Sequence, residues 1–93
     1  MIQKLFVIYD VKSETYTAPR VEPSRETGLR NFADGINDAQ GGVLFAHPED
    51  FTLFEIGTYD LRTGDIVIHE AKVAVANGMD VKLSSLDNSV AAA

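Results

Sequence analysis

The stretch His47-Pro48-Glu49-Asp50-Phe51-Thr52-Leu53-Phe54-Glu55-Ile56-Gly57-Thr58-Tyr59-Asp60, continued by Leu61-Arg62-Thr63-Gly64-Asp65, decides the fold of this chain. Pro48 fixes its own φ and favours one helical turn, after which the chain straightens into a strand over residues 51–59. Gly64 supplies the left-handed conformation that a hairpin connection needs, so a second strand is expected from residue 66 onward. The stretch therefore predicts a turn, a long strand and a hairpin.

The long strand is apolar on both of its faces. In an extended chain, Phe51 and Leu53 point to one side, and Phe54 and Ile56 point to the other. Gly57 interrupts the pattern, which predicts a β-bulge or a close approach of another backbone segment. Both faces of this strand therefore need to be covered.

Toward the N-terminus, the sequence predicts two more strands and a helix. Residues 2–9 are apolar on both alternating faces, which is typical of a central strand covered on both sides, or of a strand with one face buried by a partner subunit. Residues 16–21 are compatible with a short edge strand, because Pro19 is acceptable only at an edge. A helix is predicted over about 24–38, with Ser24 as its N-cap. Its apolar stripe consists of Leu29, Phe32, Ala33 and Ile36.

The sequence leaves the secondary structure of two segments on the C-terminal side open. Residues 43–45 are read as either a short strand or residues that plug the core, and residues 72–77 as either strand or helical turn. Val81 and Leu83 are interpreted as one last short strand, and the small, polar residues 84–93 as a disordered tail. The predicted class is α+β, with a mostly antiparallel sheet of four to five strands and one helix packed on one face. Residues 1–83 are expected to form a single domain.

Composition excludes several classes of protein. The 93 residues allow one small core, and the absence of Cys excludes disulfides and thiolate ligands. The net charge is −6, and it is uneven: residues 1–30 carry five basic and four acidic side chains, whereas residues 31–93 carry three basic and ten acidic ones. A basic field over the whole surface is therefore excluded. The N-terminal apolar run is too short to span a bilayer and no cleavage site follows it, so we expect a soluble, non-exported protein with no membrane partner.

No catalytic constellation is visible, and we expect neither enzymatic activity nor a cofactor. The two histidines both lie next to acids, His47 near Glu49 and Asp50 and His69 beside Glu70. Their spacing matches no metal motif, so exposed polar residues are the better interpretation.

The candidate binding residues lie in the first third of the chain. Aromatic side chains beside cations are what single-stranded nucleic-acid binders use, because every base offers a π face and every nucleotide a phosphate. The competing interpretation, favoured by the acidic total, is a solvated helix face and edge strand with packed tyrosines. The candidate residues are Lys12, Arg20, Arg25, Arg30, Tyr9 and Tyr16.

Three segments resemble the small nonstructural protein of gokushovirus-like microviruses, which are single-stranded DNA phages. The resemblance covers roughly residues 1–75. The segments are Ile8-Tyr9-Asp10, then Arg30-Asn31-Phe32-Ala33-Asp34 with Ile36-Asn37-Asp38, and above all His47 to Asp60. The link Ala39–Gly42 departs from the family's pattern because it lacks basic residues, and the C-terminal tail is long.

The resemblance implies a phage accessory protein that acts in viral single-stranded DNA production or packaging, by binding single-stranded DNA. It also implies a location in the host cell cytoplasm, absence from the virion, and viral or host replication or packaging proteins as partners. The alternative is a non-catalytic oligomeric adaptor that binds a viral or host protein. Because the second sheet face needs covering, we expect a homo-oligomer.

Overall fold

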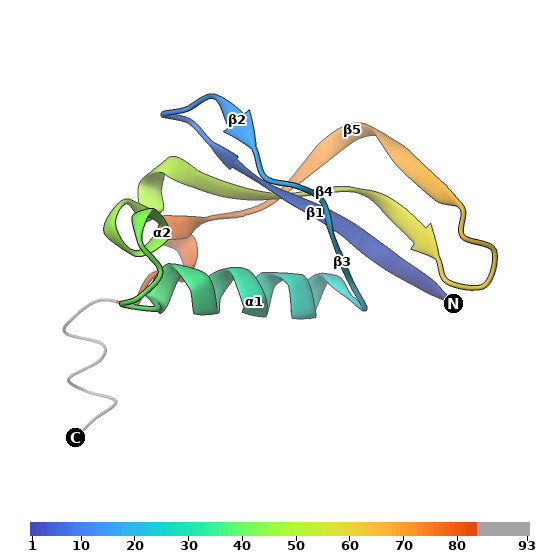
Figure 1. The fold of residues 1–93 in the computed structure, drawn as a ribbon, viewed down its shortest axis with the longest axis horizontal. Coiled ribbons are helices and arrows are strands. Elements are labelled where there is room, and N and C mark those ends of the chain that lie inside the picture. The colour runs from blue at the N-terminus through green and yellow to red at the C-terminus, as the bar shows by residue number, and fades with distance from the viewer. Residues whose placement is uncertain (84–93) are drawn as a thin grey trace, which may run out of the picture.

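The computed structural model describes residues 1–83 and contains a five-stranded antiparallel sheet with helix α1 under one face (Figure 1). The strands are β1 (Ile2–Asp10), β2 (Thr15–Tyr16), β3 (Arg20–Glu22), β4 (Phe51–Asp60) and β5 (Ile66–Asn77). The helices are α1 (Arg25–Asn37), the single turns α2 (Val43–Ala46) and α3 (Gly78–Val81), and the 3-10 turn η1 (Pro48–Asp50). The predicted α+β class is confirmed.

The sheet has the order β2-β1-β4-β5, and β3 pairs with β1 farther along the same edge. The doubly apolar strand β1 is therefore central, as its pattern predicts. The predicted irregularity at Gly57 is also confirmed, because the register between β1 and β4 shifts between Glu55 and Gly57. A side chain at Gly57 would collide with the carbonyl oxygen of Val67, so the neighbouring strand needs this glycine.

The core lies between α1 and the sheet. Ser24 caps the helix as predicted, since its Oγ accepts a hydrogen bond from the backbone N–H of Thr27 at 3.1 Å. From the predicted apolar stripe, Phe32 and Ile36 are buried, and Ile36 is completely so. They pack against the sheet residues Phe6, Phe51 and Leu53. Within residues 1–83, no helix is long and apolar enough to cross a bilayer.

The strand alternative for residues 43–45 is wrong, and the core-plugging alternative holds for Leu44 alone. Residues 43–46 form the helical turn α2, because Leu44 packs on the core and the backbone closes onto itself through a 2.8 Å bond from His47 N to Val43 O. The predicted strand at Val81 and Leu83 is likewise wrong. Asn77 and Asp80 form a capping box, which starts the turn α3 at this point.

Two other segments refine the predictions. The single edge strand expected over residues 16–21 is divided into β2 and β3, separated by the segment that contains Pro19, which has no N–H to donate. The open question at residues 72–77 is decided in favour of strand, because β5 continues to Asn77. The tail expected over residues 84–93 lies outside the described residues.

Candidate nucleic-acid interface

The face of the sheet opposite α1 is covered by no helix of the described chain, and we call it the open face (Figure 1). Alternate residues of a strand point to opposite faces. Ile8 and Leu53 belong to the core beneath α1, so their neighbours Tyr9 and Phe54 point to the open face. The fold therefore places aromatic side chains from two strands on the open face.

A third aromatic side chain joins them from the edge of the sheet. Tyr16 of β2 is paired with Tyr9 of β1, and their ring centroids lie 4.6 Å apart with a tilt of 45°. The ring of Tyr16 also meets Phe54 edge-on, with 6.2 Å between centroids. Tyr16 remains 46% exposed, so part of its ring is available to a ligand. Contacts of this kind fix the rings relative to one another.

A cation from β5 completes the group. The Nζ of Lys72 lies 5.3 Å from the centroid of the Tyr16 ring. The lysine reaches this position because the register of β5 against β4 jumps from Ile68 to Val73, which leaves residues 69–72 as a bulge. Figure 1 shows the middle of β5 arching away from α1, on the same side as β2. We call Tyr9, Tyr16, Phe54 and Lys72 the aromatic platform.

The tip of the β1–β2 hairpin is ordered by Asp10. Its carboxylate accepts hydrogen bonds from the backbone N–H of Lys12 at 2.9 Å and from Ser13 Oγ at 3.0 Å. Glu14 completes the turn in the left-handed region, at φ 57°. The candidate residue Lys12 is therefore held at an exposed tip, on the hairpin that carries Tyr9 and Tyr16.

The three candidate arginines lie on the helix side of the molecule. Arg20 is paired with Phe6 and therefore shares its face, and its guanidinium lies 3.9 Å from the carboxylate of Glu22. Arg25 begins α1, and Arg30 is exposed on the same helix. The six candidate residues thus do not form one patch, because the sheet separates the arginines from the two tyrosines.

Arg25 is engaged by a buried carboxylate, Glu55. Glu55 is only 2% exposed and accepts hydrogen bonds from Arg25 Nε at 3.1 Å and from His69 Nε2 at 2.7 Å. Lys4 Nζ lies 3.9 Å away. Burial raises the pKa of Glu55, but the hydrogen bonds from His69 and Arg25 and the charges of Arg25 and Lys4 outweigh it, so the pKa is lowered.

This charge cluster was missed at the sequence level, although a signal was present. Glu55 follows Phe51 and Leu53 at the same two-residue spacing, so strand alternation places a carboxylate on the buried face. A buried carboxylate needs cationic or hydrogen-bonding partners. Those partners come from β1, α1 and β5, so the cluster connects four elements. The cluster therefore has a structural role, and we call the set of contacts that Glu55 makes with Lys4, Arg25 and His69 the Glu55 tie.

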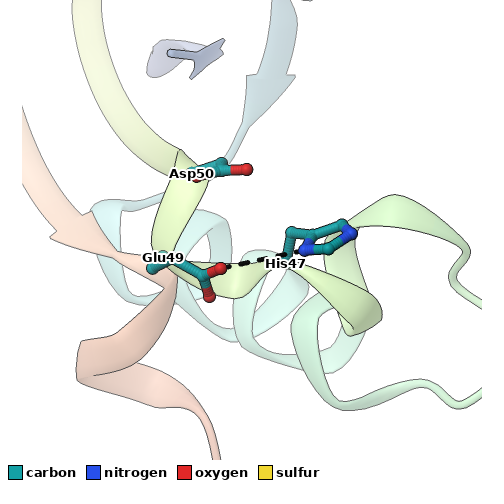
Figure 2. Close-up of side chains that lie close together, drawn as sticks. All are labelled: His47, Glu49 and Asp50. Atoms are coloured by element: carbon teal, nitrogen blue, oxygen red, sulfur yellow. Dashed lines mark ion pairs between the residues drawn. The ribbon is translucent and has the colours of Figure 1, made fainter. Parts of the chain in front are cut away.

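The histidines do not come together. His69 binds Glu55, whereas His47 lies beside η1, with its Nδ1 3.8 Å from Glu49 Oε1 (Figure 2). Asp50 lies close to this pair, and ligand atoms of all three residues fall within 4.8 Å of one another. His47 and Glu49 are well exposed, and nearness along one turn accounts for the arrangement. We assign no metal to it.

One hollow of about 150 Å³ lies on the helix side, between α1 and the first strands. Its lining is mainly apolar and includes Phe6, Phe32 and Leu44, with Arg20 and Asn31 at polar positions. Sites for small molecules usually occupy about 300 Å³ or more. The hollow is smaller than such sites, so it is a weaker candidate than the aromatic platform.

Fold and platform together define a small single-sheet α+β protein with an exposed aromatic surface. The family model described as Phage ORF5 protein matches residues 3–81, and the chain belongs to this family of small bacteriophage proteins. The matched region ends at Val81, the last residue of α3. Comparison with curated proteins gave no match, and comparison with solved structures gave none either.

Proposed function

We propose that this phage protein is a non-catalytic accessory factor in viral single-stranded DNA production or packaging, and that it binds single-stranded DNA through the aromatic platform. It acts in the cytoplasm of the host cell and is not a component of the virion. Membership of the phage family supports the setting. The single observation that carries the binding surface is the contact of Tyr16 with Tyr9, Phe54 and Lys72.

The platform has the chemistry that an unpaired base requires. A base stacks on an exposed aromatic ring regardless of its identity, and each such contact contributes about 1–3 kcal/mol to binding. Tyr16 is the most accessible ring of the group, and Tyr9 and Phe54 hold it in place. Lys72 is a flexible cation over this ring, and an incoming base displaces its ammonium toward the adjacent phosphate.

The charge distribution predicts how strongly the affinity for DNA depends on salt. The chain carries a net charge of −6, and the platform contributes one cation, with Lys12 at the nearby hairpin tip. A plot of the logarithm of the binding constant for single strands against the logarithm of the salt concentration has a slope of about −0.7 for each phosphate that the protein neutralises. With one or two phosphate contacts, we expect a slope of about −0.7 to −1.4, far shallower than for a strongly basic protein.

The test compares two cations that lie on opposite sides of the sheet. Fluorescence anisotropy with a labelled single-stranded oligonucleotide is measured at low and moderate salt for the wild type, Lys72→Gln and Arg30→Gln. Both variants lose one positive charge, but only Lys72 belongs to the platform. We expect Lys72→Gln to weaken binding and Arg30→Gln to leave it nearly unchanged. Absence of salt-dependent binding at tens of micromolar protein, or an equal loss in both variants, would exclude the platform as the site.

The second candidate function is that of an oligomeric adaptor for a viral or host protein. The observation that favours it is the exposed apolar strand β5, in which Ile66, Val67 and Ile68 are each about 60% exposed. A pull-down from infected cells with the wild type and Ile68→Lys separates the two functions. An adaptor loses a specific protein partner in this variant, whereas a DNA-binding protein keeps its affinity for an oligonucleotide short enough to occupy a single aromatic platform.

A further inference from the structure

The outer edge of β5 is a pairing surface without a partner among the described residues. β5 is the last strand in the sheet order and pairs only with β4. Ile66, Val67 and Ile68 are 58%, 62% and 62% exposed, and they alternate between both faces of the strand. The two ends of β5 are apolar, at residues 66–68 and 73–76, and the free backbone groups of an edge strand attract another strand.

The sequence of β5 is complementary to its own reverse. When two copies of Ile66–Asn77 are placed antiparallel with Ala71 at the centre, Glu70 of each copy lies opposite Lys72 of the other. Ile68 then faces Ala74, and Val67 faces Val75. Opposite charges and apolar pairs directly across two strands stabilise a sheet, whereas like charges destabilise it. A parallel, in-register pairing would place Glu70 beside Glu70, which selects the antiparallel arrangement.

We propose that the edge of β5 binds a second copy of this chain, and that the two sheets join into one continuous antiparallel sheet across a two-fold axis at Ala71. The interface is isologous and closed, because the β5 edge of each copy pairs with the β5 edge of the other and no free β5 edge remains. The Lys72 ammonium has three donors, so contact with the Tyr16 ring leaves it able to meet a carboxylate of the partner.

The two-fold axis also fixes how the two aromatic platforms of the dimer lie relative to each other, and their joint use in binding DNA rests on the proposed function. A two-fold axis that relates antiparallel neighbouring strands is perpendicular to the sheet, so both open faces lie on the same side. The dimer therefore presents two aromatic platforms on one surface, with the arched β5 strands between them. A single DNA strand that crosses this surface contacts both platforms, which raises its overall affinity.

The test is a charge exchange at the centre of the edge. Sedimentation velocity measures the dimer dissociation constant of the full chain for the wild type, Glu70→Lys, Lys72→Glu and the double variant E70K/K72E. Each single change creates two like-charge pairs across the axis, and we expect the dissociation constant to rise about tenfold. The double variant restores opposite charges and returns the constant to near the wild-type value. Asp34→Lys, on the exposed side of α1, is the matched control and leaves it unchanged.

The outcomes separate this proposal from the proposed function. A wild type that is monomeric at all concentrations, or a dimer unaffected by the single charge changes, overturns the β5 pairing, whatever the result with DNA. Ile68→Lys gives a second measure, since this exposed side chain is not needed for the core and its charge opposes pairing. In E70K/K72E the dimer returns but the platform lacks its cation, so DNA binding remains weak. A dimer without DNA binding overturns the proposed function alone.

Discussion

The Nε2 of His69 lies 2.7 Å from Oε2 of Glu55, and Arg25 Nε lies 3.1 Å from the other oxygen of the same carboxylate. One buried side chain of β4 thereby holds both the first residue of α1 and the first residue of the β5 bulge. Because that bulge also carries Lys72, the contact between Glu55 and His69 positions part of the aromatic platform from the opposite side of the sheet.

Replacement of the carboxylate tests this tie. We expect Glu55→Gln to lower the free energy of unfolding by about 1–3 kcal/mol, because the hydrogen bonds to charged partners weaken in a buried position. Arg25 is half exposed and stays hydrated, which keeps the loss in this range. Urea unfolding followed by circular dichroism at neutral pH measures the change. The exposed Glu49→Gln is the control and is expected to stay within about 0.5 kcal/mol of the wild type.

The lowered pKa of Glu55 predicts a pH dependence of stability. Its carboxyl has a pKa below the ordinary value of 4.5 in the folded protein, so the unfolded chain binds the proton more readily. The stabilisation is complete above 4.5 and is lost as the pH falls through the lower, folded pKa. We therefore expect the stability difference between the wild type and Glu55→Gln to shrink in acid. Urea titrations of both proteins over a pH series measure it, and a difference that stays constant into strong acid contradicts the assignment.

Two glycines of α1 predict opposite effects of the same substitution. Alanine is favoured over glycine in a helix by about 1 kcal/mol. At Gly35 an added Cβ meets only Leu44 at 3.5 Å, so Gly35→Ala is expected to stabilise the protein by about 0.5–1 kcal/mol. At Gly28 the Cβ would lie 2.5 Å from the buried ring of Phe6, so Gly28→Ala is expected to cost about 1–3 kcal/mol. Thermal unfolding of both variants measures the signs, and stabilisation by Gly28→Ala would contradict the close packing of helix and sheet.

Two substitutions of Tyr16 distinguish a base that stacks on its ring from a ligand that hydrogen-bonds to its hydroxyl group. Tyr16→Ala removes the most accessible ring and is expected to weaken oligonucleotide binding by about 1–3 kcal/mol, or roughly fivefold to 150-fold. Tyr16→Phe keeps the ring and is expected to bind like the wild type. Anisotropy titrations at one salt concentration compare the two, with circular dichroism as a check of folding. Equal affinities of Tyr16→Ala and the wild type would show that bases do not stack on this ring.

Several features of the fold follow from local sequence alone. The turn at Pro48, the Ser24 cap and the left-handed Gly64 each depend on the conformational limits of one residue or on its bond to a backbone group nearby. The central position of β1 followed from its two apolar faces. Local patterns left residues 43–45 open between a strand and core-plugging residues, of which Leu44 does pack on the core. They failed at Val81 and Leu83, because the Asn77 capping box starts a helical turn there.

Two of the four platform residues, Tyr9 and Tyr16, were candidates from the sequence, whereas Phe54 and Lys72 were missed. Tyr9 and Tyr16 are near in sequence, and a hairpin brings them together. Lys72 contacts Tyr16 only because the β5 bulge arches over the open face. The candidate arginines lie apart from the two tyrosines because α1 and β3 place their side chains on the other side of the sheet. The sequence by itself determined most of the strands, helix α1 with its Ser24 cap and the α+β class, since these depend on residues close in the chain. The tertiary structure alone decided which cation meets which ring and which cations bind Glu55, because sheet register and bulges set those contacts between residues far apart in the chain.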